Sequence, residues 1–159
     1  MVGTTKELAR VGWREMVVLP RFSDARIPAK IDTGARTSSL HATQIERFDR
    51  DGNRWVRFLL DIGHGDFEPV MCEVPRADHR NITSSNGQSE NRFIIKTTVG
   101  LGDVQFRAEF SLTDRSDMKF PILIGRTALR SRFLVDSGRS YLQSSGPERR
   151  RLLGQGKTE

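Results

Sequence analysis

The fold of this chain is decided by Ala29-Lys30-Ile31-Asp32-Thr33-Gly34-Ala35, an apolar strand that ends in Asp-Thr-Gly. Gly34 allows the backbone to turn where a Cβ would clash. Thr33 is β-branched and therefore stiff at χ1, which favours a fixed hydrogen bond from its hydroxyl. The segment predicts a tight turn that aims the Asp32 carboxylate and keeps it from swinging.

A second, related segment follows much later in the chain: Phe120-Pro121-Ile122-Leu123-Ile124-Gly125-Arg126. An Asp-Thr-Gly turn followed by an aliphatic run that closes in glycine is how half of an aspartic peptidase site is built. Asp-Thr-Gly alone also fits an ordinary turn, so the prediction depends on the pair of segments. Together they predict a catalytic site at Asp32, Thr33 and Gly34.

This chemistry needs two carboxylates that share one proton, so that one acts as base on water and the other as acid. The chain has one Asp-Thr-Gly, which predicts a homodimer with one Asp32 from each subunit. Asp136-Ser137-Gly138 has similar letters, but no second aliphatic-glycine segment follows it. We interpret it as a turn at the end of a strand.

Size and charge limit the function classes. The chain has 159 residues, enough for one domain with a core, and a formal net charge of +6. That charge favours an anionic partner, although a basic surface with a basic tail explains it equally well. The single Cys72 suits a reducing compartment. Neither a secretory signal nor a membrane span is evident, so we expect a cytoplasmic protein without a membrane partner.

Short strands separated by turns predict an all-β fold, a barrel or a sandwich, rather than alternating strands and helices. Turn signals such as Asp51-Gly52 and Asn86-Gly87 separate the strands. One short helix is expected at residues 127–132. We expect a flexible N-terminus at residues 1–10, one domain at residues 11–145, and a basic disordered tail at residues 146–159.

Residues 29–42 closely resemble the signature of a bacterial retropepsin-like aspartic peptidase family that carries the label ATP-dependent zinc protease. These proteins occur with ATP-grasp glutamate ligases of the RimK type. The resemblance covers residues 11–143 and extends to residues 12–15, 84–92, 123–129, 133–136 and 140–141. It implies a closed retropepsin-like β-barrel, a homodimer, and acidic, glutamate-rich peptide substrates. Pro121-Ile122-Leu123-Ile124-Gly125 departs conservatively from the Met-Leu-Leu-Gly type of string common in the family.

The hairpin at residues 84–91 is the candidate flap, a mobile cover that excludes water from a bound peptide, with an ordinary exposed turn as the alternative. Arg36, Arg80, Arg92 and Arg126 are candidate contacts for acidic side chains, because the guanidinium fork matches a carboxylate. Arg126 is also a candidate for a structural salt bridge. The predicted substrate-binding residues are Ala35, Arg36, Thr37, His41, Ser85, Asn86, Gly87, Arg92, Gly125 and Arg126.

The family label raises the question of zinc and ATP. His41, His64, His79 and Cys72 are scattered, without the paired spacing of a zinc site, and we predict no metal. Residues 154–158 imitate the end of a phosphate loop, but Arg151 stands where the first glycine should be, and no strand precedes it. We predict no cofactor.

Two functions remain open at this point. The first is a homodimeric aspartic endopeptidase that acts on acidic peptide tails. The alternative is a non-catalytic β-barrel module that binds an anionic polymer, either nucleic acid or acidic protein. Only a peptidase needs both glycine-closed segments. The strands also lack the aromatic series that stacks single-stranded nucleic acid, so nucleic acid is the less favoured partner.

Overall fold

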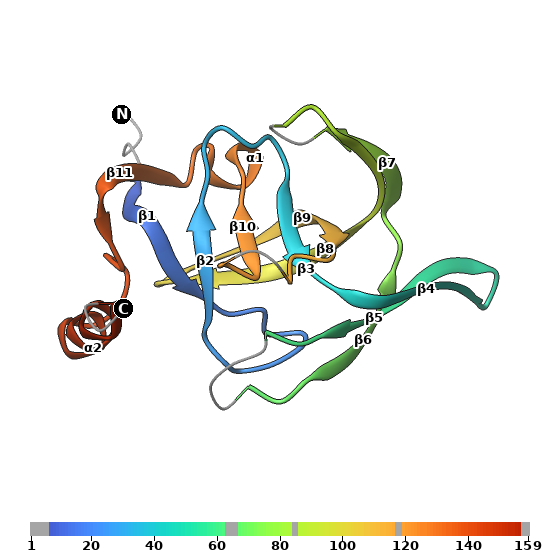
Figure 1. Ribbon diagram of the computed structural model, residues 1–159, viewed down its shortest axis with the longest axis horizontal. Coiled ribbons are helices and arrows are strands. Elements are labelled where there is room, and N and C mark those ends of the chain that lie inside the picture. The colour runs from blue at the N-terminus through green and yellow to red at the C-terminus, as the bar shows by residue number, and fades with distance from the viewer. Residues whose placement is uncertain (1–6, 63–66, 84–85, 117–118, 157–159) are drawn as a thin grey trace, which may run out of the picture.

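The computed structural model describes residues 7–62, 67–83, 86–116 and 119–156. These residues are mostly strands, which confirms the all-β prediction (Figure 1). The strands are β1 (Ala9–Val17), β2 (Ile27–Ile31), β3 (Ser38–His41), β4 (Thr43–Arg50), β5 (Asn53–Leu60), β6 (Val70–Pro75), β7 (Asp78–Thr83), β8 (Ser89–Leu101), β9 (Val104–Thr113), β10 (Ile122–Ile124) and β11 (Phe133–Ser140). The helices are α1 (Arg126–Leu129) and α2 (Gly146–Gly156).

An eight-stranded sheet with the order β11-β1-β2-β10-β3-β9-β8-β7 forms most of the molecule, and β4-β5-β6 form a second sheet. Within the larger sheet, β2 and β10 run parallel, with Ile31 opposite Ile124. Parallel neighbours end at the same edge of a sheet, so Asp32 and Gly125 leave their strands side by side. The Asp32 N–H donates to the Ile124 carbonyl at 2.9 Å.

Beyond its strand ladders, the larger sheet makes one further connection. Val18, directly after β1, and Gly100 of β8 exchange two backbone hydrogen bonds, of 2.9 Å and 2.8 Å. The sheet therefore curls far enough for β1 to reach β8. A fully closed barrel remains a prediction.

The core lies on the inner faces of the strands. In β2, Ile27, Ala29 and Ile31 are buried while Lys30 is exposed, as the two-residue period of a strand requires. Phe58 and Phe110 are among the largest fully buried side chains. This packing holds the strand that leads into Asp32.

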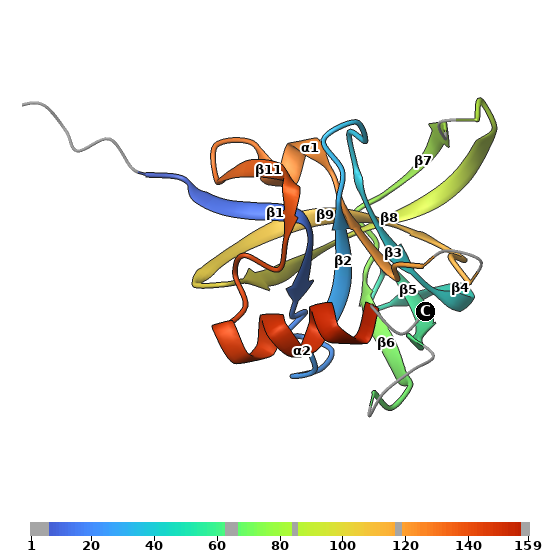
Figure 2. The same ribbon diagram turned by 60° about the vertical axis from the view of Figure 1, so that its left-hand side comes forward.

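The predicted disordered tail is wrong for most of its length, because residues 146–156 form helix α2. Ser145 caps the helix: its Oγ accepts the Glu148 N–H at 3.2 Å. Glu148 also forms an ion pair with Arg26 at 2.6 Å. The Ser-x-x-Glu spacing is a capping pattern that marks the start of a helix. Figure 2 shows α2 lying across the lower end of β1 and β2. Residues 157–159 lie outside the described residues.

The structure also differs in detail from the predictions for the short helix, the N-terminus and Asp136-Ser137-Gly138. The expected single helix near residues 127–132 is α1, which begins at Arg126, and the described residues form two helices rather than one. The expected flexible N-terminus ends earlier than predicted, since β1 begins at Ala9; residues 1–6 lie outside the described residues. Asp136-Ser137-Gly138 lies within β11, not at its end.

Glu15 connects the first strand to the segment after the last one. Its side chain is fully buried, and its carboxylate accepts three backbone N–H groups: Gly12 at 2.7 Å, Leu142 at 2.8 Å and Gln143 at 3.0 Å. Burial of a charge is costly unless hydrogen bonds replace its water. These three donors fill that role and bring two distant parts of the chain together.

Candidate active site

The Asp-Thr-Gly turn holds its own carboxylate. Asp32 is half-buried, and its Oδ1 accepts the Gly34 N–H at 2.9 Å. A Cβ on Gly34 would lie 3.2 Å from the same oxygen. The clash expected for a side chain at this position would therefore be with the Asp32 carboxylate. Thr33 is exposed, and its hydroxyl makes no hydrogen bond to any residue that the structure describes. The fixed hydrogen bond expected of Thr33 is therefore not made in this part of the chain.

The Gly125 segment supports this turn from behind. The Gly125 N–H donates to Ser38 Oγ at 3.0 Å, and the Arg126 N–H donates to the Ala35 carbonyl at 2.7 Å. Arg126 Nη1 donates to the Thr33 carbonyl at 3.1 Å. Arg126 thus stabilises the turn through a hydrogen bond, and the salt bridge considered for it is not formed among the described residues.

The two segments approach closely. A Cβ on Gly125 would lie 2.8 Å from the carbonyl carbon of Thr37 and 2.9 Å from the Ala35 oxygen. The Thr127 hydroxyl donates to the Arg36 carbonyl at 2.9 Å. The structure therefore brings together the predicted residues Ala35, Thr37, Gly125 and Arg126. Arg36 has an exposed side chain, and no described residue pairs with it.

The candidate flap is the hairpin of β7 and β8. It projects on the same side of the molecule as the loop between β2 and β3, which carries Asp32 (Figures 1 and 2). Asn86 and Gly87 are exposed, and Gly87 has a φ of +85°. At its base, Thr83 Oγ1 and Ser89 Oγ lie 2.9 Å apart. Ser85, also predicted here, lies outside the described residues.

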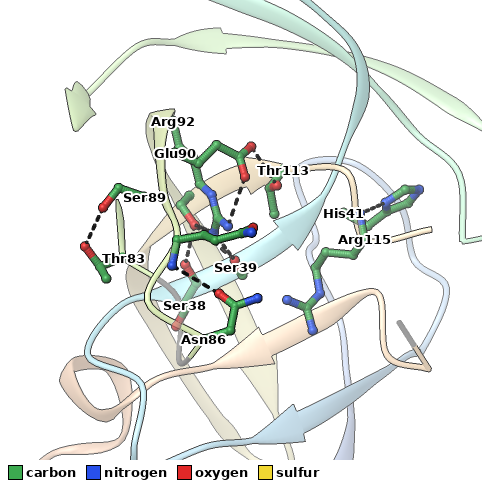
Figure 3. A network of polar contacts seen from close by, with 12 residues as sticks. Ser38, Ser39, His41, Thr83, Asn86, Ser89, Glu90, Arg92, Thr113 and Arg115 are labelled. Atoms are coloured by element: carbon green, nitrogen blue, oxygen red, sulfur yellow. Dashed lines mark hydrogen bonds and ion pairs between the residues drawn. The ribbon is translucent and has the colours of Figure 1, made fainter. Parts of the chain in front are cut away.

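Arg92 is enclosed where β8 meets β3 and β9 (Figure 3). Its side chain is 14% exposed, and Nη1 donates to Ser39 Oγ and Ser111 Oγ, each at 3.3 Å. The two serine oxygens lie 3.0 Å apart. Nη2 of Arg92 lies 3.4 Å from Glu90 Oε2, and Glu90 Oε1 accepts the Thr113 hydroxyl at 3.2 Å. This network connects the base of the flap to the sheet.

His41, one of the predicted substrate-binding residues, is nearly buried. Its side chain is 10% exposed, and Nδ1 accepts the Arg115 N–H at 2.8 Å. Asp114 Oδ1 lies 3.8 Å from the same nitrogen, but an ion pair there would require a proton on Nδ1. Because Nδ1 already accepts the Arg115 N–H, it acts here as the acceptor nitrogen of the ring. His41 positions the backbone of Arg115.

Arg115 is the residue that sequence reasoning missed. Its Nε donates to the Phe120 carbonyl at 3.1 Å, and its side chain extends from His41 toward the Arg92 network (Figure 3). Burial and the positive charge of Arg92 lower the pKa of Arg115, whereas the negative charge of Asp32 raises it. The guanidinium therefore lies within electrostatic range of both. No motif surrounds Arg115, so no sequence signal pointed to it.

Arg80 is structural. It forms ion pairs with Asp78 at 2.6 Å and with Glu109 at 3.1 Å, through a two-pronged contact to the Glu109 carboxylate. Two acidic partners already occupy its guanidinium. The carboxylates of a substrate would have to displace them, so Arg80 is a poor candidate for substrate binding.

Within the described ranges, no three His, Cys, Asp or Glu side chains gather as a metal site; His64 lies outside these ranges. Burial raises the pKa of the Cys72 thiol to about 12, against the opposing charge of Arg21. A protonated, buried thiol is a poor metal ligand. The portion of the chain that the structure describes also contains no helix with the length and apolarity to cross a membrane.

A cavity of about 510 Å³ lies away from Asp32, between α2 and strands β1 and β2. Its lining contains no residue of the Asp-Thr-Gly turn, and Phe120, at the start of the Gly125 segment, is the one lining residue from that segment. We place the candidate active site at Asp32 in spite of this cavity, because the carboxylate and its bracing segment are there. The cavity is lined by Arg14, Met16, Ala25, Arg26, Pro28, Ile62, Phe67, Lys119, Phe120, Tyr141, Arg151 and Leu152.

Comparison with known proteins places this geometry among relatives. A family model described as "Retropepsin-like aspartic endopeptidase RimB" matches residues 10–146. A protein named probable alpha-L-glutamate ligase from Shewanella pealeana is 39% identical over 132 residues, which cover 82% of this chain and 29% of that protein. A protein of the same name from Desulfotalea psychrophila is 38% identical over 127 residues, covering 79% and 27%. This chain thus spans less than a third of those relatives.

A solved structure shares the fold. It is a Legionella pneumophila protein described as having unknown function, with a TM-score of 0.73 and 25% sequence identity. The match covers 86% of this chain and 98% of the Legionella chain. Nearly the whole of that protein therefore corresponds to the domain described above.

Proposed function

Because this chain belongs to the RimB-like family of retropepsin-like aspartic endopeptidases, we propose that it hydrolyses peptide bonds as an aspartic endopeptidase. The observation that carries the proposal is the Asp32 turn. Its carboxylate is fixed by the Gly34 N–H at 2.9 Å, and the Gly125 segment braces the turn through Ala35 and Thr33. A carboxylate held in one orientation is what general acid–base catalysis requires.

The proposed mechanism needs a homodimer, because the described chain presents one such turn. Two Asp32 carboxylates would share one proton, since like charges at short distance do not both ionise. The ionised carboxylate removes a proton from water, and the resulting hydroxide attacks the peptide carbonyl carbon. The protonated carboxyl transfers its proton to the carbonyl oxygen. Collapse of the tetrahedral intermediate then breaks the C–N bond, and a proton passes to the leaving amine.

We propose acidic, glutamate-rich peptide tails as the substrate. The relatives named probable alpha-L-glutamate ligase contain a segment similar to this chain within a longer protein, which links a domain of this kind to glutamate chemistry. The net charge of +6 agrees with an acidic partner. A peptidase that removes glutamate residues added by a ligase would need both the link to glutamate chemistry and a surface that attracts acidic peptides.

The decisive test is Asp32→Asn, assayed by mass spectrometry on a protein with a poly-glutamate tail and on neutral peptides. The change is nearly isosteric, so the fold should persist. Cleavage should fall by roughly a hundredfold to ten-thousandfold or more, because the acid–base pair is lost. The matched control is Asp136→Asn, since Asp136 also accepts the N–H of the glycine two residues on, at 3.1 Å.

Asp136→Asn should cleave as well as the wild type does. Comparable turnover by a correctly folded Asp32→Asn protein would exclude the aspartic mechanism. EDTA should leave cleavage unchanged. Loss of cleavage with EDTA and its recovery with zinc would replace the carboxylate mechanism with a metal-dependent one.

One observation favours the alternative, a module that binds an anionic polymer. On the β4–β5 hairpin, the Arg50 guanidinium lies 4.4 Å from the Trp55 ring centroid and 5.2 Å from that of Phe48. Arg50 also forms an ion pair with Glu73 at 2.8 Å, so its guanidinium already has an acidic partner. Tight, salt-sensitive binding of nucleic acid together with absence of cleavage would favour this module over the peptidase.

A further inference from the structure

Arg115 has hydrogen-bond donors to spare, and its side chain extends toward the Arg92 network at the base of the candidate flap (Figure 3). Its Nε is used by the Phe120 carbonyl, and its backbone N–H by His41 Nδ1. Its two terminal nitrogens have no acceptor among the residues that the structure describes. Half-buried polar groups without partners cost free energy, and more so when they are charged. The guanidinium is therefore held through Nε, and its two terminal nitrogens lack an acceptor among the described residues.

Arg92 strengthens the positive field at the same place. Its Nη1 is held by the hydroxyls of Ser39 and Ser111, and Glu90 balances its charge from 3.4 Å. The Arg92 Nε is buried without an acceptor among the described residues. Arg92 is thus held by several polar contacts, and its positive charge acts on the Arg115 guanidinium.

We propose that Arg115, positioned by His41 and Phe120 and supported by Arg92, binds a substrate carboxylate next to the scissile bond. The guanidinium fork matches a carboxylate in two parallel hydrogen bonds. This subsite would select a glutamate or aspartate side chain, and it rests on the proposed function. Among the predicted arginines, Arg36 and Arg126 do not have this role: Arg36 is exposed, and Arg126 bonds the Thr33 carbonyl.

The test measures binding without hydrolysis. A labelled glutamate-rich peptide and its glutamine counterpart are titrated into Asp32→Asn by fluorescence anisotropy, with and without Arg115→Gln. Arg115→Gln should weaken binding of the glutamate peptide about tenfold, because a hydrogen bond between charged groups is lost. The glutamine peptide should bind almost unchanged. Peptides with an amidated C-terminus distinguish a side-chain carboxylate from the terminal one.

Two further variants keep the result decisive. Arg115→Lys retains the charge and should retain part of the preference for glutamate, which settles the case if Arg115→Gln unfolds. The matched control is Arg107→Gln, an exposed arginine of β9 that donates to the Lys96 carbonyl at 3.4 Å, and it should change neither affinity. Equal losses for both peptides, or no loss in folded Arg115→Gln, would overturn the subsite.

The outcomes separate this inference from the proposed function. Binding that prefers glutamate through Arg115, in a wild-type protein that cleaves nothing, would support the subsite and reject the peptidase. Cleavage that depends on Asp32 but is indifferent to Arg115 would support the peptidase and reject the subsite.

Discussion

Gly125 is the residue at which a single added methyl group would disturb the site most directly. Its backbone φ is −91°, which any residue adopts, so the constraint is space alone. A Cβ would lie 2.8 Å from the Thr37 carbonyl carbon and 2.9 Å from the Ala35 oxygen, and both are backbone atoms. Those atoms cannot rotate away as a side chain would. The Asp32 turn itself must move to admit the methyl group.

We therefore expect Gly125→Ala to destabilise the fold by about 1–3 kcal/mol, as overpacking does, and to lower cleavage further than the loss of folded protein explains. Thermal unfolding and turnover of the folded fraction measure the two effects. The control is Gly154→Ala in α2, where nothing lies within 4 Å of the added Cβ. It should be neutral or slightly stabilising, because alanine favours helix. Full activity in Gly125→Ala would mean that the turn tolerates movement.

At this scale, local patterns predicted the residues that the backbone itself positions. Asp32 and Gly125 come together because each follows a strand within the quoted segments, and those strands are parallel neighbours. Arg115 could not be predicted, since its position depends on a turn after β9 and on a buried histidine. His41 was expected to bind substrate, which stays a prediction; its burial and its hydrogen bond to the Arg115 N–H depend on packing that the sequence does not show.

Among the elements, β1 depends on its buried carboxylate. Glu15→Gln would replace one acceptor oxygen by an amide NH₂ facing backbone N–H donors. We expect a loss of about 2–4 kcal/mol in the free energy of unfolding, as for a buried charged hydrogen-bond network that is broken on one side. Denaturant unfolding measures it. Glu46→Gln, an exposed carboxylate whose Arg57 partner is 3.9 Å away, should change stability little.

If Glu15→Gln proved as stable as the wild type, the three N–H groups would have found other acceptors. The segment at residues 142–143 would then be held by its packing alone. Hydrogen exchange at those amides would distinguish the two cases, since an amide that loses its acceptor exchanges faster.

The elements were predictable where their own residues alternate. Strand β2 has its apolar side chains at every second position, and the core accepts them. Helix α2 was not predicted, because the three arginines at residues 149–151 indicated a basic tail. The helix begins instead at the cap formed by Ser145 and Glu148. Its ion pair with Arg26 links residues that are far apart in sequence, and no local pattern announces such a contact.

At the level of the whole molecule, the proposed dimer can be tested by mixing. Equal amounts of wild type and Asp32→Asn, allowed to exchange subunits, should leave about a quarter of the dimers with two Asp32 residues. Activity should therefore fall to about a quarter of the pure wild-type value at the same total protein concentration, rather than to one half. Turnover measured across a series of mixing ratios checks this.

The control is mixing with Asp136→Asn, which should not lower activity, because every dimer then keeps both Asp32 residues. Activity in strict proportion to the wild-type fraction, with subunit exchange verified by mass spectrometry, would show that each chain is complete. A monomer by light scattering at the assay concentration would contradict the model as well.

For the whole molecule, the all-β architecture followed from short strands and turns, whereas the sheet order did not. The order β11-β1-β2-β10-β3-β9-β8-β7 pairs strands that are distant in sequence. Such pairings depend on how much apolar surface the whole fold buries, and a short stretch of sequence does not reveal that quantity.

The contacts of Glu15 join residues that the ribosome synthesises at very different times. Leu142 and Gln143, which donate to its carboxylate, follow it by 127 and 128 positions. At about 5–20 residues per second, a ribosome delivers them roughly six to twenty-five seconds after Glu15. Until then the nascent β1 lacks two of the three N–H groups that bind the Glu15 carboxylate. The larger sheet is therefore complete only after Ser140, the last residue of β11, has been synthesised, and β1 cannot gain its parallel partner before the rest of the sheet has been made.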